Sequence, residues 1–374
     1  MEFFKYRIDE ITINLDNLRK PLNNLERKKL SVKKLYPYYG ANSIMDYVDD
    51  YIFDEEILCI AEDGGSWGFK EKCSYIVNEK CWINNHAHVL KAKDDSLNLK
   101  YLNYYLNYID LNNKITGTTR GKLTKSALNS IEILLPNIMN QNKIVQILDK
   151  SQELIDKRKE QIGNLDELIK SRFVEMFGDP VKNTKNWKIK KVIDVCDCMV
   201  PGRDKPKSFT GDIPWITIED LNVNGVTYKS KSNLGLTDCE INQVKRKKVP
   251  KDSVLMSCVG NLGICSIAGK ELIINQQLHS FQCRKINNFF LMYYLGFRKD
   301  YMISKASSTT VLYMNKTVCN SIPVYLPPIE LQNEFEDFVK QVDKLKFEME
   351  KSLKELEDSF NSLMQKAFKG ELFE

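Results

Sequence analysis

The feature that most constrains this chain is an internal repeat, in which residues recur at one constant offset. Leu135-Pro136 and Gln141-Asn142 recur, 191 residues later, as Leu326-Pro327 and Gln332-Asn333. The same offset relates further residues in chain order: Asn84 to Asn275, His88 to His279, Lys125 to Lys316, and Asn129-Ser-Ile131 to Asn320-Ser-Ile322. A unit of about half of the 374 residues indicates a duplicated domain rather than a solenoid of short repeats.

A long helix is predicted after each Leu-Pro. Residues 140–177 contain no proline, and a single glycine, Gly163, interrupts good helix formers. Apolar residues recur every seven positions in both copies, and we expect them to pack the helices together: Leu148, Ile155, Ile162 and Ile169, then Val342, Met349, Leu356 and Leu363. The natural partner of each stripe is the other, which predicts an antiparallel intramolecular coiled coil. A coiled coil between two copies of the chain is the alternative.

The segments before the two helices are predicted to be mixed α/β modules. Short apolar runs between turns indicate strands, as in residues 56–60, 88–91, 254–257 and 273–274. A short helix follows in each module, at 99–108 and 289–297. The predicted fold class is therefore α/β (α+β), with two modules separated by two long antiparallel helices in a pseudo-two-fold repeat. The modules match at their C-terminal halves and diverge at their starts.

Composition narrows the function classes. The formal net charge of +5 permits a nucleic-acid partner without demanding one. The N-terminus lacks the pattern of a signal peptide, and no stretch reaches the roughly 20 apolar residues of a membrane span. The ten cysteines are mostly scattered singly, which is typical of reduced thiols, so we expect a cytoplasmic protein that does not associate with membranes.

No catalytic or metal-binding pattern stands out. The pair His86-x-His88 could bind a metal, but structural histidines are the better interpretation, since no Cys, Asp or Glu lies at ligand spacing in the matching place of the second copy. No phosphate-binding loop with Gly-Lys-Ser/Thr occurs, and Leu326-Pro-Pro-Ile329 lacks the polar and aromatic ends of a methyltransferase motif. We expect no catalytic residue, no metal and no cofactor on this chain.

The chain does supply the side chains that contact DNA. Phosphates are bound by Lys, Arg, Ser, Thr and Asn, and base edges are read by Arg, Asn and Gln. A polar Thr-Thr loop recurs late in both modules, and a basic stretch lies near each start. The predicted DNA-contacting residues are Lys33, Lys34, Tyr38, Tyr39, Asn42, Thr118, Thr119, Arg120 and Lys122 in the first module, and Arg203, Lys205, Lys207, Thr309, Thr310, Tyr313, Asn315 and Lys316 in the second.

Taken in order, these features resemble the specificity subunits of type I restriction–modification systems. The resemblance covers essentially the whole chain and rests on the repeat and on several short motifs: Tyr38-Tyr-Gly-Ala-Asn42, Ser171-Arg-Phe-Val-Glu-Met-Phe-Gly-Asp-Pro180, Gly211-Asp-Ile-Pro-Trp-Ile216 and Lys366-Ala-Phe-Lys-Gly-Glu-Leu372. The first module lacks the Gly-x-Thr-Pro-like turn that many family modules carry.

The resemblance implies two target-recognition domains, residues 1–136 and 180–327, and two spacer helices, 137–179 and 328–374. Each domain would read one half of a bipartite site in double-stranded DNA, and the helices would set the gap. Two modification (methyltransferase) subunits would dock on the apolar residues that the helix pair leaves exposed, Ile155 and Ile162 among them, and restriction subunits would join them. S-adenosylmethionine, ATP and Mg would then be bound by these partners. Two alternatives remain open: a free-standing DNA-binding or coiled-coil scaffold protein, and an enzyme with unrecognised motifs.

Overall fold

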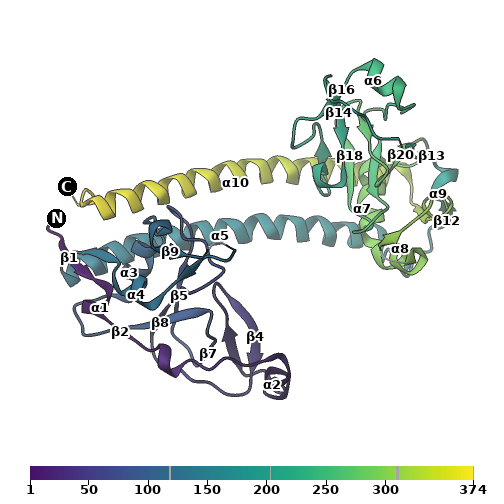
Figure 1. The fold of residues 1–374 in the computed structure, drawn as a ribbon. Helices are drawn as coiled ribbons and strands as arrows, with labels where there is room; N and C mark the ends of the chain where they lie inside the picture. Colours follow the sequence, from purple (N-terminus) through teal and green to yellow (C-terminus); the bar gives the residue numbers. More distant parts are fainter. Residues whose placement is uncertain (118, 203, 309–310, 374) are drawn as a thin grey trace. The chain divides into compact units, whose positions relative to one another are not determined.

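The computed structural model describes residues 1–117, 119–202, 204–308 and 311–373, and the chain divides into two compact units. Unit 1 comprises Met1–Lys159 and Lys351–Glu374, and unit 2 comprises Glu160–Glu350. Each unit is therefore one α/β module together with a part of each long helix, α5 and α10 (Figure 1).

The two long helices confirm the prediction from the heptad pattern. Helix α5 covers Ile138–Phe177 and helix α10 covers Ile329–Lys369. Each ends at a glycine in the left-handed region, Gly178 with φ 79° and Gly370 with φ 84°. A residue with a Cβ is strained in this conformation, which explains why glycine follows both helices.

Within each unit the two helices run antiparallel. In unit 1 the buried residues Ile144 and Leu148 share a core with Met364 and Phe368, and Lys159 Nζ lies 2.9 Å from Glu357 Oε1. In unit 2 Lys346 Nζ lies 2.7 Å from Asp166 Oδ1, and the rings of Phe173 and Phe335 are 5.3 Å apart. Of the predicted packing residues, four are buried and four half-buried: Leu148, Ile155, Ile169 and Val342, then Ile162, Met349, Leu356 and Leu363.

The module of unit 1 is built on a four-stranded antiparallel sheet in the order β2-β8-β5-β6 and a three-stranded sheet in the order β4-β3-β7. Strand β1 pairs with β11, and β9 with β10. The elements of the module are β1 Phe4–Arg7, α1 Ile8–Ile11, β2 Thr12–Asn14, α2 Asn24–Lys29, β3 Tyr36–Tyr39, β4 Ile44–Val48, β5 Ile57–Ala61, β6 Ser74–Val77, β7 Trp82–Ile83, β8 Ala87–Ala92, α3 Leu99–Leu106, β9 Ile115–Thr116, β10 Lys122–Leu123, α4 Lys125–Asn129 and β11 Glu132–Leu135.

The module of unit 2 repeats this plan with one more strand in the larger sheet. The orders are β13-β20-β17-β18-β15 and β16-β14-β19, with β12 paired to β23 and β21 to β22. Its elements are β12 Lys188–Lys191, β13 Cys196–Met199, β14 Ile213–Ile216, β15 Val226–Thr227, β16 Gly235–Leu236, α6 Asp238–Gln243, β17 Val254–Ser257, β18 Cys265–Ala268, β19 Ile273–Ile274, β20 Leu278–Cys283, α7 Asn288–Phe297, α8 Lys299–Lys305, β21 Ser307–Ser308, β22 Leu312–Tyr313, α9 Lys316–Asn320 and β23 Pro323–Leu326.

These elements confirm the predicted strands and short helices and give the strand order that the sequence leaves open. The parallel pair β3–β7 of unit 1, with Tyr39 opposite Ile83, has its equivalent in β14–β19 of unit 2, with Ile216 opposite Ile274. Along the described residues, no helix combines the length and the apolar character that crossing a bilayer requires.

Candidate nucleic-acid interface

A short β-hairpin rests on a strand-connecting loop in the same way in both units. In unit 1 the hairpin β9–β10 pairs with the β5–β6 loop: Asp63 bridges Lys122, and Leu123 N donates to Glu62 O at 2.8 Å. In unit 2 the hairpin β21–β22 pairs with the β17–β18 loop: Val259 bridges Tyr313, and Met314 N donates to Cys258 O at 2.9 Å. The two hairpins are therefore equivalent, and in the sequence the recurring Thr-Thr segment falls between the two strands of each.

The hairpin of unit 1 carries two cations above two acids. Arg120 Nη2 lies 2.5 Å from Asp63 Oδ1, and Lys122 Nζ lies 3.0 Å from Glu62 Oε1. The acids are largely covered, at 18% and 13% exposed, whereas the Arg120 and Lys122 side chains are 61% and 51% exposed. The buried carboxylates thus orient Arg120 and Lys122. The solvent-facing sides of these two cations stay open to an anionic partner such as a phosphate.

The acids belong to a buried polar network that reaches the core of the module. Arg19 Nη1 donates to Glu62 Oε2 at 2.6 Å, and His88 Nδ1 lies 2.6 Å from Asp16 Oδ2. Burial alone would raise the pKa of Asp16, but the hydrogen bond and the charge of His88 lower it below its usual value. Burial alone would likewise raise the pKa of Glu62, but the hydrogen bonds from Arg19 and Lys122 lower it below its usual value. Both carboxyl groups are therefore held ionised, which fixes the loop beneath the hairpin.

The same positions in unit 2 carry no such charges. The hairpin pairing makes Cys258 and Val259 the equivalents of Glu62 and Asp63, and the repeat offset makes Val311 and Tyr313 the equivalents of Arg120 and Lys122. Val311 and Tyr313 are 53% and 41% exposed. One backbone frame thus presents a cationic surface in unit 1 and an apolar, aromatic one in unit 2.

A loop before β14 adds polar groups to unit 2. Glu240 accepts from Ser208 Oγ at 2.5 Å and from Thr210 N at 3.2 Å. These hydrogen bonds, that of the Ser208 hydroxyl first, lower the pKa of Glu240 to about 2. Glu240 therefore anchors the segment that exposes Lys205 and Lys207.

The predicted DNA-contacting residues of unit 1 are placed differently from one another. Asn42 Nδ2 donates to Gly64 O at 3.2 Å, which joins the β3–β4 turn to the loop under the hairpin. Thr119 is exposed between the strands β9 and β10 of that supported hairpin. Lys33 and Lys34 are exposed at the opposite end of the β3–β4 hairpin, where their backbone N–H groups donate to Asp49.

Two of the predicted contacts are corrected by their burial. Tyr38 is 2% and Tyr39 9% exposed, so neither ring can meet a DNA base. Tyr38 packs in a core with Val48 and Trp82, and Tyr39 donates its hydroxyl to Glu79 at 3.0 Å. The aromatic pair in this motif therefore stabilises the module.

In unit 2, Asn315 accepts from Val318 N at 3.0 Å and so caps helix α9, while Lys316 is exposed beside it. Thr118, Arg203, Thr309 and Thr310 lie outside the described residues.

The repeated Gln-Asn pair joins each long helix to its module. Gln141 accepts from Asn98 N at 2.8 Å and donates to Ser96 O and Pro136 O at 2.9 and 2.8 Å. In unit 2, Gln332 accepts from Asn287 N at 2.9 Å and donates to Pro327 O at 2.8 Å. The repeated Gln therefore serves in both units to fix the start of the long helix to the loop before the short helix of the module.

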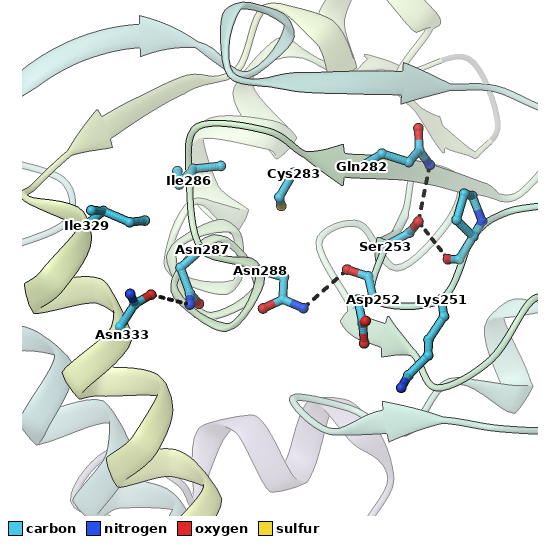
Figure 2. Close-up of a pocket in the computed structure, with 11 residues that line it drawn as sticks. Lys251, Asp252, Ser253, Gln282, Cys283, Ile286, Asn287, Asn288, Ile329 and Asn333 are labelled. Atoms are coloured by element: carbon cyan, nitrogen blue, oxygen red, sulfur yellow. Dashed lines mark hydrogen bonds between the residues drawn. The ribbon is translucent and has the colours of Figure 1, made fainter.

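Figure 2 shows the pocket beside this junction in unit 2, of about 380 Å³. Asn287 and Asn333 face each other there, with Asn287 Nδ2 3.1 Å from Asn333 Oδ1, and Asn288 Nδ2 donates to Asp252 O at 3.2 Å. Because these amides bind one another and the backbone, they hold the junction together and leave little for a ligand.

The described residues contain no group of three His, Cys, Asp or Glu side chains arranged to hold a metal ion. His86 instead pairs with Asp63, its Nδ1 2.9 Å from Oδ2, and His88 with Asp16. The arrangement is that of a binding surface: polar and charged side chains on loops that a rigid sheet positions.

Comparison with known proteins identifies the family. The family model for the type I restriction modification DNA specificity domain matches this chain twice, over residues 4–164 and 184–358. A putative type I restriction enzyme specificity subunit from Haemophilus influenzae is 39% identical over 142 residues, which is 38% of this chain and 35% of that protein. The putative MjaX specificity subunit from Methanocaldococcus jannaschii is 23% identical over 301 residues, 76% of this chain and 70% of that protein.

Solved structures share the fold. The type I S subunit from M. genitalium matches with a TM-score of 0.55 at 14% identity, over 98% of this chain and 96% of that one. A chain from a study of complex assembly and conformational transition in the type I R-M system matches with a TM-score of 0.58 at 17% identity, over 99% and 98%. Since the family model matches well over half of the residues, in two copies, this chain belongs to the family of type I restriction–modification specificity subunits.

Proposed function

We propose that this chain is the sequence-specific DNA-binding subunit of a type I restriction–modification complex, and that each module reads one half of a bipartite target. The observation that carries the proposal is the pair of hairpins. They are held by equivalent backbone bonds in the two units, yet carry Arg120 and Lys122 in one and Val311 and Tyr313 in the other. A common frame with different surface chemistry is what two modules reading different sequences require.

The DNA contacts divide by chemistry. Arg120 and Lys122 suit phosphate oxygens, as do Lys205, Lys207 and Lys316, which are all exposed. Asn42, Thr119 and Tyr313 are placed on or beside the same loops. In this proposal residues 1–136 and 180–327 are the recognition domains, and residues 137–179 and 328–374 are spacer helices that set the gap between the half-sites.

The catalytic work falls to partner subunits. Two modification subunits dock on the helices, restriction subunits join them, and S-adenosylmethionine, ATP and Mg are bound by those subunits. The candidates for docking are apolar side chains that helix pairing leaves exposed, taken unit by unit: Leu154 in unit 1, and Leu168, Leu345 and Phe347 in unit 2. Ile155 is not among them, because it is 3% exposed.

Methylation sequencing of DNA from cells that express the chain with a cognate methyltransferase subunit tests the proposal. We expect a methylated two-part motif with a fixed gap, lost when this chain is deleted. Replacing residues 1–136 by the same region of another specificity subunit should change one half of the motif only. Absence of any motif, despite a complex confirmed by co-purification, would refute the proposal.

A further inference from the structure

A second turn lies beside the hairpin in each unit, between β7 and β8 in unit 1 and between β19 and β20 in unit 2. Each is built on a buried asparagine that accepts a hydrogen bond from the backbone two residues later. Asn84 Oδ1 accepts from His86 N at 2.8 Å, and Asn275 Oδ1 accepts from Gln277 N at 3.0 Å. The asparagines are equivalent in the sequence repeat, and so are the turns.

The frame around the two turns is also the same. Asn84 N donates to Tyr39 O at 3.1 Å, and Asn275 N donates to Ile216 O at 2.9 Å, in each case on the parallel neighbour strand. The turn is then bonded to the loop that supports the hairpin, through Glu62 N to His86 O and Cys258 N to Gln277 O, both 2.8 Å. Each turn therefore belongs to the same surface as its hairpin.

The side chains that this frame presents differ between the units. Unit 1 presents Asn85, which is exposed, and His86, which is half-buried beside Asp63. Unit 2 presents Gln276 and Gln277, both half-buried. The asparagine that builds the turn is retained, while the two following residues, which it positions, differ. A turn with only a structural role does not need one retained asparagine followed by two residues that differ between the units. A surface that reads two different sequences does need such a pattern.

The turn of unit 2 also borders a pocket of about 360 Å³, lined in addition by Lys205, Phe209, Trp215 and Thr217. Gln277 Oε1 accepts from Asn275 Nδ2 at 2.7 Å. In contrast, Gln276 Oε1 is shielded from solvent and has no hydrogen-bond partner within the described part of the chain. A buried acceptor without a donor is unfavourable, so this carboxamide is matched to a ligand that brings an N–H group.

A base edge supplies that group. A glutamine or asparagine carboxamide accepts from N6 of adenine and donates to N7, which makes adenine the base that such side chains read in the major groove. We propose that residues 85–86 in unit 1 and 276–277 in unit 2 are base-reading positions, one pair for each half of the target. This inference rests on the proposed function and names the specificity-determining residues within it.

The test exchanges the pairs between the units. Gln276→Asn with Gln277→His places the pair of unit 1 on the turn of unit 2, and Asn85→Gln with His86→Gln does the reverse. Because the asparagine frame is retained, both variants should fold. Each full-length variant is expressed with the cognate methyltransferase subunit, and the methylated motif is sequenced. A matched control, Gln341→Ala, removes an exposed glutamine of α10 in unit 2.

We expect each exchange to alter one or two adjacent positions in one half of the motif, an adenine-containing pair among them, and to leave the other half and the gap unchanged. If a variant methylates too little DNA, the affinity of its complex is measured for the wild-type duplex and for duplexes altered at single base pairs. A selective loss of discrimination, roughly 5- to 150-fold at one or two positions, supports the proposal. An unchanged motif, or a uniform loss of affinity for all duplexes, overturns the inference alone. A wild-type chain that directs no motif overturns the proposed function, and the inference with it.

Discussion

His88 and His279 occupy equivalent places in the repeat, but their surroundings differ in charge. His88 faces the carboxylates of Asp16 and Glu62 at 2.6 and 3.7 Å. Among the described residues no carboxylate forms an ion pair with His279, and its Nε2 is buried without a hydrogen bond that meets normal geometry. Burial above all lowers the pKa of His279 to about 4, against the opposing effect of Asn320, and the charge of Lys316 adds to the lowering. The repeated histidine thus belongs to a charged hydrogen-bond network in unit 1, whereas in unit 2 it is buried in its neutral form.

The lowered pKa of His279 predicts a loss of stability in mild acid. The unfolded imidazole takes up a proton as the pH falls below about 6.5, whereas the folded one stays neutral until about 4. The contribution of His279 to the free energy of unfolding is therefore fully present above pH 6.5. It is lost as the pH falls to 4, and this loss amounts to at most about 3 kcal/mol. Urea denaturation from pH 4 to 7 measures it. The variant His279→Asn should show a flatter pH dependence, and an identical slope would contradict the prediction.

Gln141 is expected to matter more for stability than its polar character suggests. It is fully buried, and truncation to alanine leaves Asn98 N, Ser96 O and Pro136 O without their partner. We expect Gln141→Ala to lower the free energy of unfolding by about 2–4 kcal/mol, measured by urea denaturation. The control Gln146→Ala, at an exposed position of the same helix, should change it by less than about 0.5 kcal/mol. Equal effects of the two substitutions would argue against the anchoring role.

At the scale of elements, the hairpin β9–β10 is the clearest cationic feature of the candidate interface. If Arg120 binds a phosphate, DNA binding releases a counterion for it. Arg120→Ala should therefore weaken binding to all sequences alike and reduce the slope of log affinity against log salt by roughly 0.9. The matched variant Val311→Ala, at the equivalent uncharged position, should leave the slope unchanged. Affinity measured with the assembled complex at several salt concentrations decides this, and an unaltered slope for Arg120→Ala would exclude the phosphate contact.

The elements also differ in how well the sequence predicts them. The helices α5 and α10 follow from local periodicity and from glycines at their ends, and the strands β5, β8, β17 and β19 follow from short apolar runs. The candidate site depends instead on long-range pairs, such as Glu62 with Lys122 and Asp16 with His88. No local pattern reveals these pairs. For the same reason Tyr38 and Tyr39 were predicted to contact DNA, whereas the sheet that buries them is assembled from distant segments. The repeat did indicate which loops are equivalent, because Asn84 and Asn275 mark both turns.

At the scale of the whole molecule, each unit has its own hydrophobic core. The core of unit 1 joins α3 to both long helices through Tyr101, Leu148 and Phe368. The core of unit 2 joins α7 to both long helices through Phe290, Phe173 and Phe335. A unit that is stabilised by its own core tolerates change at its loops, which is consistent with a common frame that carries different recognition surfaces.

The proposed assembly with methyltransferase subunits leads to a prediction that separates docking from folding. Phe347 is 65% exposed on α10 and lines a pocket of about 440 Å³ within unit 2, together with Val223 and Tyr228, which are each 59% exposed. Exposed apolar side chains that gather at a hollow on an otherwise charged surface are typical of a protein contact. Phe347→Asp should therefore abolish co-purification with the methyltransferase subunit while leaving the thermal unfolding midpoint nearly unchanged.

Two controls give that experiment its meaning. Gln341→Asp introduces the same charge at an exposed position of α10 without removing apolar surface, so the complex should persist. Ile155→Asp places a charge at a residue that is 3% exposed, so it should lower the unfolding midpoint as well as prevent assembly. If Phe347→Asp still co-purifies, the partner does not cover this patch. If it instead unfolds like Ile155→Asp, the ring stabilises unit 2, and the docking surface has to lie elsewhere on the helices.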